Sequence, residues 1–137
     1  MKATVDANVF FSALLKKGET RRIWFNPEIE LYAPAFILAE FRKYSGYLMK
    51  KSSLAEEDFF ALAEKLFLQV SFVDDKELKP FLPAAASLSE DLKDWLYLAC
   101  ALKEDTIIWS EDKEFKKQNR VRVLTIQEML KEFGGLK

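Results

Sequence analysis

Short apolar runs and longer amphipathic segments alternate along the chain. The short runs are continuous rather than interrupted by polar residues, which is typical of strands that are covered on both faces of a parallel sheet. They predict strands at residues 3–5, 29–33, 70–73, 106–109 and 121–124.

Between these runs, apolar residues recur three or four positions apart, as expected for helices that bury one face. This spacing predicts helices at residues 9–15, 19–26, 36–50, 54–68, 95–102 and 125–133. Ser87 and Ser89 compete as the N-cap of the fifth of these helices. Gly134-Gly135 is expected to end the last helix.

Two further segments have weaker patterns. Residues 78–88 contain Pro80 and Pro83 and are expected to form a loop with a short helical turn, and residues 111–117 a short helix or turn. The elements therefore mostly follow the order strand, helix, strand, helix, which favours a parallel sheet with helices on both faces. We expect a single α/β domain over residues 1–137, with three α/β/α layers and a mostly parallel central sheet of four to five strands.

Four acidic residues lie near strand ends or in the helices between strands. Asp6 directly follows the first strand, and Asp112 lies just past the fourth. Glu40 is in the helix after the second strand, and Asp94 begins the helix that leads into the fourth. Because ligand-binding groups gather at the carboxyl ends of strands in open α/β sheets, we expect several of these acids to meet at one rim.

Each acid also has an ordinary structural explanation. Asp6 and Asn8 are residue types that often form turns and cap helices. Glu40 shares a helix face with apolar residues, and a salt bridge to a nearby lysine or arginine would explain it. Asp91 and Asp94 fall in or near the first turn of a helix, where acids interact favourably with the helix dipole, and the same explanation applies to Asp112 after a Ser110 cap. The functional interpretation therefore depends on whether the acids meet in space.

The composition restricts the possible chemistry. The chain has no histidine, one cysteine, and 21 basic against 22 acidic residues, which gives a net charge of −1. These counts exclude a Ser-His-Asp triad, a Cys-His pair, a histidine zinc site and an internal disulfide. Cys100 lies in an apolar helical run and suits a core position in a reducing cytosol. We see neither a membrane span nor a secretory signal, so we expect a cytoplasmic protein with no membrane partner.

Hydrolysis in such a chain must use carboxylates, hydroxyls, lysines or a metal ion held by oxygen ligands. Four carboxylates at one rim would raise one another's pKa in the absence of a counter-charge. Carboxylate oxygens suit Mg²⁺ or Mn²⁺. Such ions can activate water for the in-line displacement of a phosphodiester.

Four stretches of the chain resemble those of a known family. They are TVDANVFFSALL with Asp6 and Asn8, AEFRKY with Glu40, DLKDWLYLACAL with Asp94, and IIWSEDKEF with Ser110 and Asp112. In their order and spacing they resemble the PIN-domain ribonuclease family, of the VapC-like kind. The resemblance extends from the first strand to the last.

The resemblance implies a PIN-like fold and a metal-dependent endoribonuclease, and many members of the family are the toxin of a prokaryotic toxin–antitoxin pair. It implies that the catalytic and metal-binding residues, with Mg²⁺ or Mn²⁺ as cofactor, are Asp6, Glu40, Asp94 and Asp112. It further implies that Asn8 and Ser110 orient the site, and Asp91 is an additional acid that could do so. The implied partners are RNA, an antitoxin protein and a second copy of the chain in a homodimer.

The chain departs from the family at Glu111, because a glycine usually precedes the fourth acid. An extra acidic side chain at the rim favours an alternative function, a PIN-like module that binds RNA or a partner protein without cutting it. A third interpretation is a receiver-type phosphoacceptor. The single acid after the first strand, Asp6, disfavours this third interpretation.

RNA would have to approach an acidic rim, so nearby cations are candidate phosphate contacts. One group follows the fourth strand: Lys113, Lys116, Lys117, Arg120 and Arg122. A second group is near Glu40: Arg42, Lys43, Lys50 and Lys51. The ordinary meaning of such residues is a solvated face. Tyr44 and Tyr47 are candidates for stacking on bases, with packing or a dimer interface as the alternative.

Overall fold

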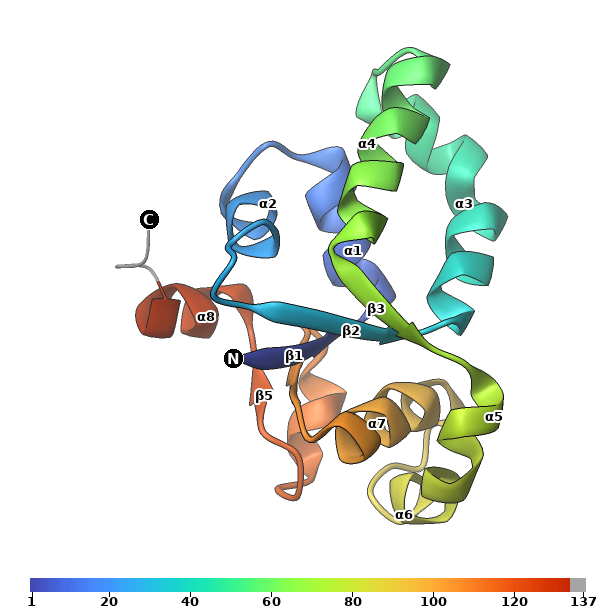
Figure 1. Ribbon diagram of the computed structural model, residues 1–137, viewed down its shortest axis with the longest axis vertical. Coiled ribbons are helices and arrows are strands. Elements are labelled where there is room, and N and C mark those ends of the chain that lie inside the picture. The colour runs from blue at the N-terminus through green and yellow to red at the C-terminus, as the bar shows by residue number, and fades with distance from the viewer. Residues whose placement is uncertain (134–137) are drawn as a thin grey trace.

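The computed structural model describes residues 1–133 and contains a central sheet of five strands (Figure 1). The strands are β1 (Lys2–Val5), β2 (Glu30–Pro34), β3 (Val70–Val73), β4 (Ile107–Trp109) and β5 (Val123–Leu124). Their order across the sheet is β3-β2-β1-β4-β5, so the first strand of the chain is in the centre. Every pair is parallel, which confirms the predicted α/β class with a sheet that is parallel throughout.

Helices cover both faces of the sheet and form the outer layers of a three-layer arrangement (Figure 1). The first layer contains α1 (Ala7–Leu15), α2 (Glu19–Trp24), α3 (Phe36–Ser52), α4 (Glu56–Leu68) and α8 (Ile126–Phe133). The second contains α5 (Asp75–Leu78), η1 (Lys79–Phe81), α6 (Leu82–Ala86), α7 (Leu92–Glu104) and η2 (Lys113–Lys117). The elements labelled η are short 3₁₀ helices.

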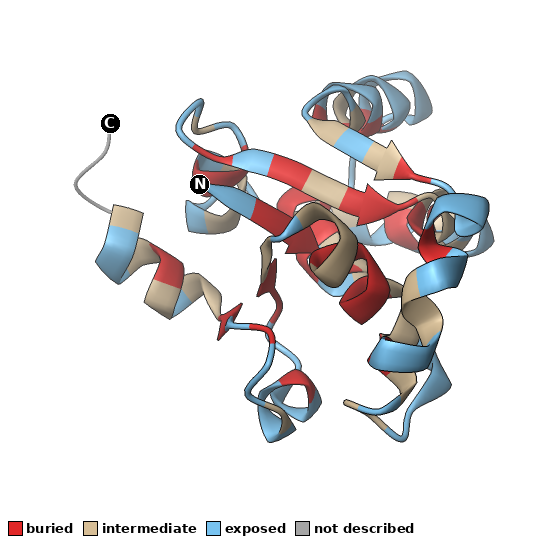
Figure 2. Cartoon of the chain, turned by 60° about the horizontal axis from the view of Figure 1, so that its bottom comes forward, coloured by how far each residue is buried: buried red, intermediate tan, exposed pale blue. Residues whose placement is uncertain are grey.

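The central strand β1 is covered on both faces. Ala3, Thr4 and Val5 have no exposed surface, and Figure 2 shows buried residues along the middle of the sheet. The hydroxyl of Thr4 is paired with that of Thr106 at 2.7 Å, so this buried polar group is satisfied. The continuous apolar character of the run is therefore a consequence of its central position, as the sequence pattern indicates.

Residues 78–88 differ from the prediction, because they are mostly helical instead of a loop with one helical turn. The side chain of Asp74 caps α5 by accepting a hydrogen bond from the backbone N–H of Glu77 at 2.9 Å. Pro80 and Pro83 lie in the first turns of η1 and α6. Proline is tolerated there because the N–H it lacks has no partner within the helix, so the two prolines do not interrupt the helical path.

The predicted end of the last helix at Gly134-Gly135 lies outside the described residues. Within residues 1–133, no helix combines the length and the apolar composition that crossing a membrane requires. The strand predicted at residues 121–124 is confirmed over its last two residues, Val123 and Leu124.

Phe10 joins α1 to the helices around it. Its ring is fully buried, and its centroid lies 4.3 Å from that of Phe67, 5.5 Å from that of Phe41 and 5.9 Å from that of Trp24.

We expect Phe10→Ala to lower the free energy of unfolding by about 3–5 kcal/mol, because it leaves a cavity among closely packed rings. Urea unfolding followed by circular dichroism measures this loss. Phe25→Ala, which removes a ring that is 38% exposed, is the control, and equal losses in the two variants would contradict the expectation.

Candidate functional site

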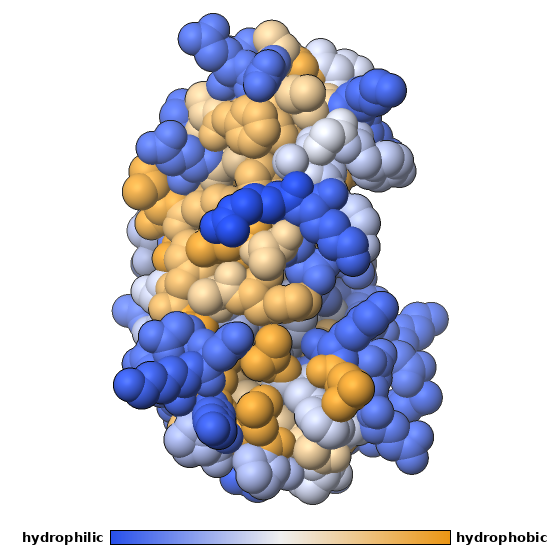
Figure 3. All heavy atoms as spheres, turned by 90° about the vertical axis from the view of Figure 1, so that its right-hand side faces the viewer, coloured by the Kyte–Doolittle hydropathy of each residue, from blue (hydrophilic) through white to orange (hydrophobic). Residues whose placement is uncertain are grey.

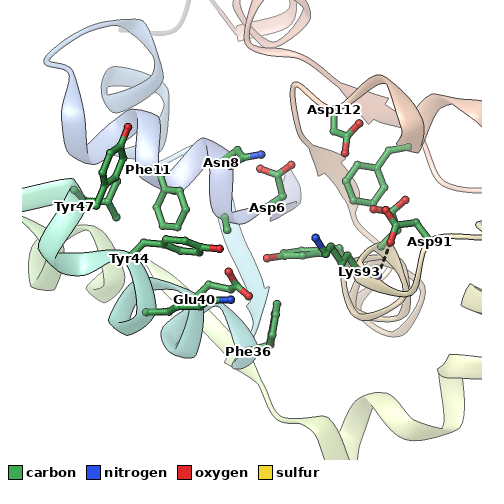
Figure 4. A pocket seen from close by; sticks show the side chains of 16 residues that line it. Asp6, Asn8, Phe11, Phe36, Glu40, Tyr44, Tyr47, Asp91, Lys93 and Asp112 are labelled. Carbon is green, nitrogen blue, oxygen red and sulfur yellow. Dashed lines mark hydrogen bonds between the residues drawn. The ribbon is translucent and has the colours of Figure 1, made fainter. Parts of the chain in front are cut away.

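A pocket of about 450 Å³ opens at the carboxyl-terminal edge of the sheet (Figure 4). The residues that follow β1 and β4, together with α1, α3 and α7, form its lining. The predicted site residues that line it are Asp6, Asn8, Glu40, Asp91, Asp94 and Asp112. Ser110 does not line the pocket, but it is buried and its hydroxyl contacts Asp6. The structure therefore brings these residues together from four separate segments of the chain.

Asp6 is both the N-cap of α1 and part of the pocket. Its Oδ1 accepts a hydrogen bond from the backbone N–H of Val9 at 2.9 Å, and its Oδ2 accepts one from the hydroxyl of Ser110. Its exposed fraction is only 5%. The capping role that Asp6 shares with many aspartates is thus real, and it fixes the carboxylate at the pocket.

The register between β1 and β4 places Ser110 beside Asp6. Val5 is paired with Trp109, so the residues that follow the two strands are neighbours. The Ser110 hydroxyl also accepts a hydrogen bond from the backbone N–H of Asp112 at 3.0 Å. Asp112 in turn caps η2, because its Oδ1 accepts a hydrogen bond from the N–H of Glu114 at 2.9 Å. Ser110 therefore connects the first and the fourth acid.

The environment of Asp6 makes its negative charge costly. Burial raises the pKa of Asp6 from 3.8 to about 6, although the hydrogen bonds from Ser110 and Val9 oppose this shift. The nearby carboxylate of Asp112 raises the pKa further. A positive charge in the pocket would relieve both effects.

Asp94 is held by a serine in a similar way. It is 4% exposed, and its Oδ2 accepts a hydrogen bond from the hydroxyl of Ser89 at 2.9 Å. The Ser89 hydroxyl accepts one from the N–H of Asp91 at 3.1 Å, and the Ser89 carbonyl accepts one from Nε1 of Trp95 at 2.8 Å. Burial raises the pKa of Asp94, the hydrogen bond from Ser89 lowers it, and the nearby carboxylates, Asp91 first among them, raise it.

The N-cap of α7 is Asp91, so the prediction of Ser87 or Ser89 was wrong. Asp91 Oδ1 accepts a hydrogen bond from the backbone N–H of Lys93 at 3.0 Å. Ser89 instead uses its hydroxyl to orient Asp94, and sequence reasoning missed this role. The S-x-x-E pattern is a local signal, and it gave no information about the tertiary contact that Ser89 makes.

Glu40 faces the pocket from α3, across from Asp6 (Figure 4). Among residues 1–133 it forms no ion pair, so the salt bridge that would have explained it structurally is absent. Tyr97 also lines the pocket, and burial together with the carboxylates of Asp6 and Glu40 raises its pKa. Sequence reasoning missed Tyr97, although its position three residues after Asp94 on one helix face was a usable signal.

The pocket has an excess of negative charge. It contains five carboxylates against two lysines, Lys43 and Lys93, and in the described chain none of the five carboxylates forms an ion pair. Carboxylate oxygens with an amide oxygen from Asn8 make a hard donor set that suits Mg²⁺ or Mn²⁺. The chemistry of the lining therefore fits a divalent ion. As the side chains stand, however, no three acids within residues 1–133 are grouped closely enough to hold one ion together.

The first group of candidate phosphate contacts is largely engaged elsewhere. Lys116 pairs with Glu128, Lys117 with Glu114, and Arg122 with Glu132, and the pocket lining includes none of these cations. The four cations of the second group form no ion pair within residues 1–133. The cations without an ion pair in the described chain therefore include the four of α3, of which Lys43 lines the pocket, and Lys93 of α7, which also lines it.

Glu111 does not add an acidic side chain to the pocket, contrary to expectation. Its Oε2 accepts a hydrogen bond from the backbone N–H of Ile126 at 2.6 Å, and Ile126 is the first residue of α8. The carboxylate thus satisfies an N–H that a helix leaves unpaired at its start. The glutamate that stands at position 111, where the family usually has a glycine, therefore serves the start of α8 rather than the pocket.

Comparisons with known proteins show similarity both to a family and to a solved structure. A family model described as "PIN domain" matches residues 4–133. The fold is similar to that in a crystal structure of VapBC2 from Rickettsia felis bound to a DNA fragment from their promoter. That similarity has a TM-score of 0.71 and 13% sequence identity, and it covers 91% of this chain and 98% of the other. No curated protein matches the chain in sequence.

The raised pKa of Asp6 predicts a pH dependence of stability. In the unfolded chain the pKa returns to 3.8, so the folded state binds more protons between about pH 4 and 6 and loses stability as the pH rises through that window. A shift of this size corresponds to roughly 3 kcal/mol. Asp6→Asn retains an N-cap oxygen and removes this titration.

We therefore expect Asp6→Asn to be more stable than the wild type at pH 8 in EDTA, and the difference to shrink towards pH 4. Urea unfolding at a series of pH values measures both free energies. A difference that does not change with pH would show that Asp6 carries no such cost.

Proposed function

The chain belongs to the PIN domain family, and we propose that it is a metal-dependent endoribonuclease that hydrolyses RNA phosphodiester bonds. One observation carries the proposal: acids that are far apart in the sequence line a single pocket at the carboxyl-terminal edge of the sheet. The resulting excess of negative charge is what a site for a divalent cation requires.

In this proposal, Asp6, Glu40, Asp94 and Asp112 hold Mg²⁺ or Mn²⁺, directly or through water. A bound divalent ion would lower the pKa of a water molecule and supply positive charge to the phosphate that is attacked. The remaining contributions come from the chain itself, in the orientation of carboxylates, the placement of the substrate and the electrostatics of the pocket.

Two serines keep the buried carboxylates in place. Ser110 donates to Oδ2 of Asp6, and Ser89 donates to Oδ2 of Asp94 at 2.9 Å. Each carboxylate therefore enters the pocket in a fixed orientation, which reduces the reorganisation needed when charge develops on the substrate. Asn8 and Asp91 lie at the rim, where we assign them to orienting the substrate.

Lys43 and Lys93 are the cations in the pocket lining. We assign them to the non-bridging oxygens of the phosphates next to the cleaved bond, because an anionic substrate must be attracted to a pocket that is itself acidic. By family resemblance, the product would carry a 5′-phosphate.

We further propose that the protein is the toxin of a toxin–antitoxin pair, acts on RNA in the cytoplasm and forms a homodimer. The structural similarity to the VapBC2 complex supports an antitoxin as partner. The free and buried thiol of Cys100 is compatible with a reducing compartment. Because the PIN domain model matches residues 4–133, we do not retain the interpretation of the chain as a receiver-type phosphoacceptor.

A PIN-like binding module without nuclease activity is the second candidate function. It is favoured by the absence, within residues 1–133, of three acids already grouped around one ion position. Glu111 no longer favours it, because its carboxylate binds the start of α8. Cleavage of RNA in the presence of Mn²⁺, with and without EDTA, separates the two functions.

We expect Asp6→Asn and Asp94→Asn to reduce Mn²⁺-dependent RNA cleavage by roughly two orders of magnitude or more, the scale seen when a group that stabilises transition-state charge is lost. Gel assays of a labelled RNA measure the rate, and circular dichroism verifies the fold. The matched control is Asp105→Asn, which changes an exposed acid in the left-handed conformation at the end of α7, outside the pocket. Cleavage that survives both pocket substitutions, or that is insensitive to EDTA, would contradict the proposal.

We expect Glu111→Gly to leave the cleavage rate within about twofold of the wild type and to cause a small loss of thermal stability, because it removes a contact at the start of α8. The same cleavage assay and a thermal melt measure the two effects. A large gain in cleavage would show that the Glu111 carboxylate does restrain activity.

A further inference from the structure

One side of the pocket is aromatic. We call Phe11, Tyr44 and Tyr47 the aromatic wall, and all three line the pocket that contains the acids (Figure 4). The exposed fraction of Tyr44 is 39% and that of Tyr47 is 63%. The two tyrosines are three residues apart on α3, so they share a helix face. Core packing does not account for rings with this much exposed surface.

The aromatic wall is anchored in the core. The ring of Phe11 meets that of Tyr44 edge to face, with centroids 6.1 Å apart and an interplanar angle of 73°. Phe11 also contacts the fully buried Phe10, at a centroid distance of 5.9 Å. Tyr44 therefore packs against a ring that contacts the core, while 39% of its own surface remains exposed to a ligand.

Cations accompany both tyrosines. The Nζ atom of Lys43 lies 5.3 Å from the centroid of the Tyr44 ring, and that of Lys51 lies 5.7 Å from the centroid of Tyr47. α3 contains four cations, Arg42, Lys43, Lys50 and Lys51, and a single acid, Glu40. Because none of these cations is in an ion pair within the described chain, α3 is locally positive in a protein whose net charge is −1.

The surface around α3 is mixed in character. Figure 3 shows the face that carries α3, where strongly hydrophilic side chains border and cross a band of apolar ones. Aromatic rings with unpaired cations beside them suit a ligand that has both flat rings and negative charge, which is the chemistry of a single nucleic acid strand. An apolar protein segment would use the rings but leave the cations without a partner.

The spacing along α3 also fits a polynucleotide. Glu40, at the acidic side of the pocket, and Tyr44 are four residues apart, which is about 6 Å along a helix axis. A base attached to a nucleotide whose phosphate lies at the acids would therefore be close to the Tyr44 ring. In a duplex both faces of a base are covered by neighbouring pairs, so only an unpaired base could stack there.

We propose that the aromatic wall binds an unpaired base of the RNA substrate by stacking on Tyr44 and Tyr47, with the cations of α3 contacting the adjacent phosphates. Stacking on an unpaired base would account for a preference of this site for single-stranded over duplex RNA. This inference rests on the proposed ribonuclease function, because it names the residues that would bind a base of the substrate.

Binding can be measured without cleavage by using the full chain with Asp6→Asn in EDTA. The probe is a fluorescein-labelled, unstructured RNA of about ten nucleotides, within the range that single-strand binding sites cover. We expect Tyr44→Ala and Tyr47→Ala each to weaken binding roughly tenfold, which is the scale of losing one base–aromatic stack. Tyr44→Phe and Tyr47→Phe should bind within about twofold of the parent, because the flat ring is retained.

Phe60→Ala is the matched control, because it removes a ring on α4 that is 42% exposed and outside this pocket. The same RNA annealed to its complement should bind at least about tenfold more weakly than the single strand. Circular dichroism verifies that each variant is folded.

Normal RNA binding by folded Tyr44→Ala and Tyr47→Ala would overturn the inference, as would equal affinity for single strand and duplex. If Tyr44→Ala and Tyr47→Ala leave RNA binding unchanged and alter only the mass of the protein assembly measured by light scattering, the aromatic wall is a protein interface and the inference is wrong. Tyrosine-dependent RNA binding by a wild type that does not cleave would support the inference and contradict the ribonuclease function. RNA cleavage by the wild type, together with RNA binding that does not depend on Tyr44 or Tyr47, would support the ribonuclease function and contradict the inference.

Discussion

The structure depends on a carboxylate that is buried at the end of the central strand. Asp6 follows β1, and the sheet order places it between the ends of β2 and β4. It is held there by the N–H of Val9 and the hydroxyl of Ser110, but burial still raises its pKa to about 6. A cation that enters the pocket therefore stabilises the folded protein, because it favours the ionised form of Asp6.

The two buried aspartates have the same type of support. Ser110 and Ser89 each accept a hydrogen bond from the backbone N–H two residues later, and each donates its own hydroxyl proton to the carboxylate. The hydrogen bond from the backbone N–H holds each serine hydroxyl in place, and that hydroxyl in turn orients the carboxylate of Asp6 or Asp94. Glu40 and Asp112 are less buried, so the pocket combines two rigid carboxylates with two on its more accessible side.

Much of this could be predicted from the sequence, because strand ends are visible in it. The continuous apolar runs located all five strands, and the acids close to them followed from the general position of sites in parallel sheets. The sequence therefore predicts that several of Asp6, Glu40, Asp94 and Asp112 meet at one rim, and in the structure all four line one pocket.

Other features could not be predicted, because they depend on contacts between distant segments. The contact of Ser89 with Asp94 requires the bend before α7, and the S-x-x-E pattern suggested a cap instead. Glu111 reaches the start of α8, fifteen residues later, and no local rule indicates this. The two prolines of residues 78–88 favoured a loop, whereas their first-turn positions allow helix.

The central claim is that the acids of the pocket act together as the site of a divalent cation. Titration of the metal-free protein with Mn²⁺, followed by electron paramagnetic resonance of the free ion, tests it directly and requires no RNA. We predict saturable binding by the wild type that is strongly weakened in Asp94→Asn and unchanged in Asp105→Asn. Equal binding by all three proteins, or no binding by the wild type, would contradict it.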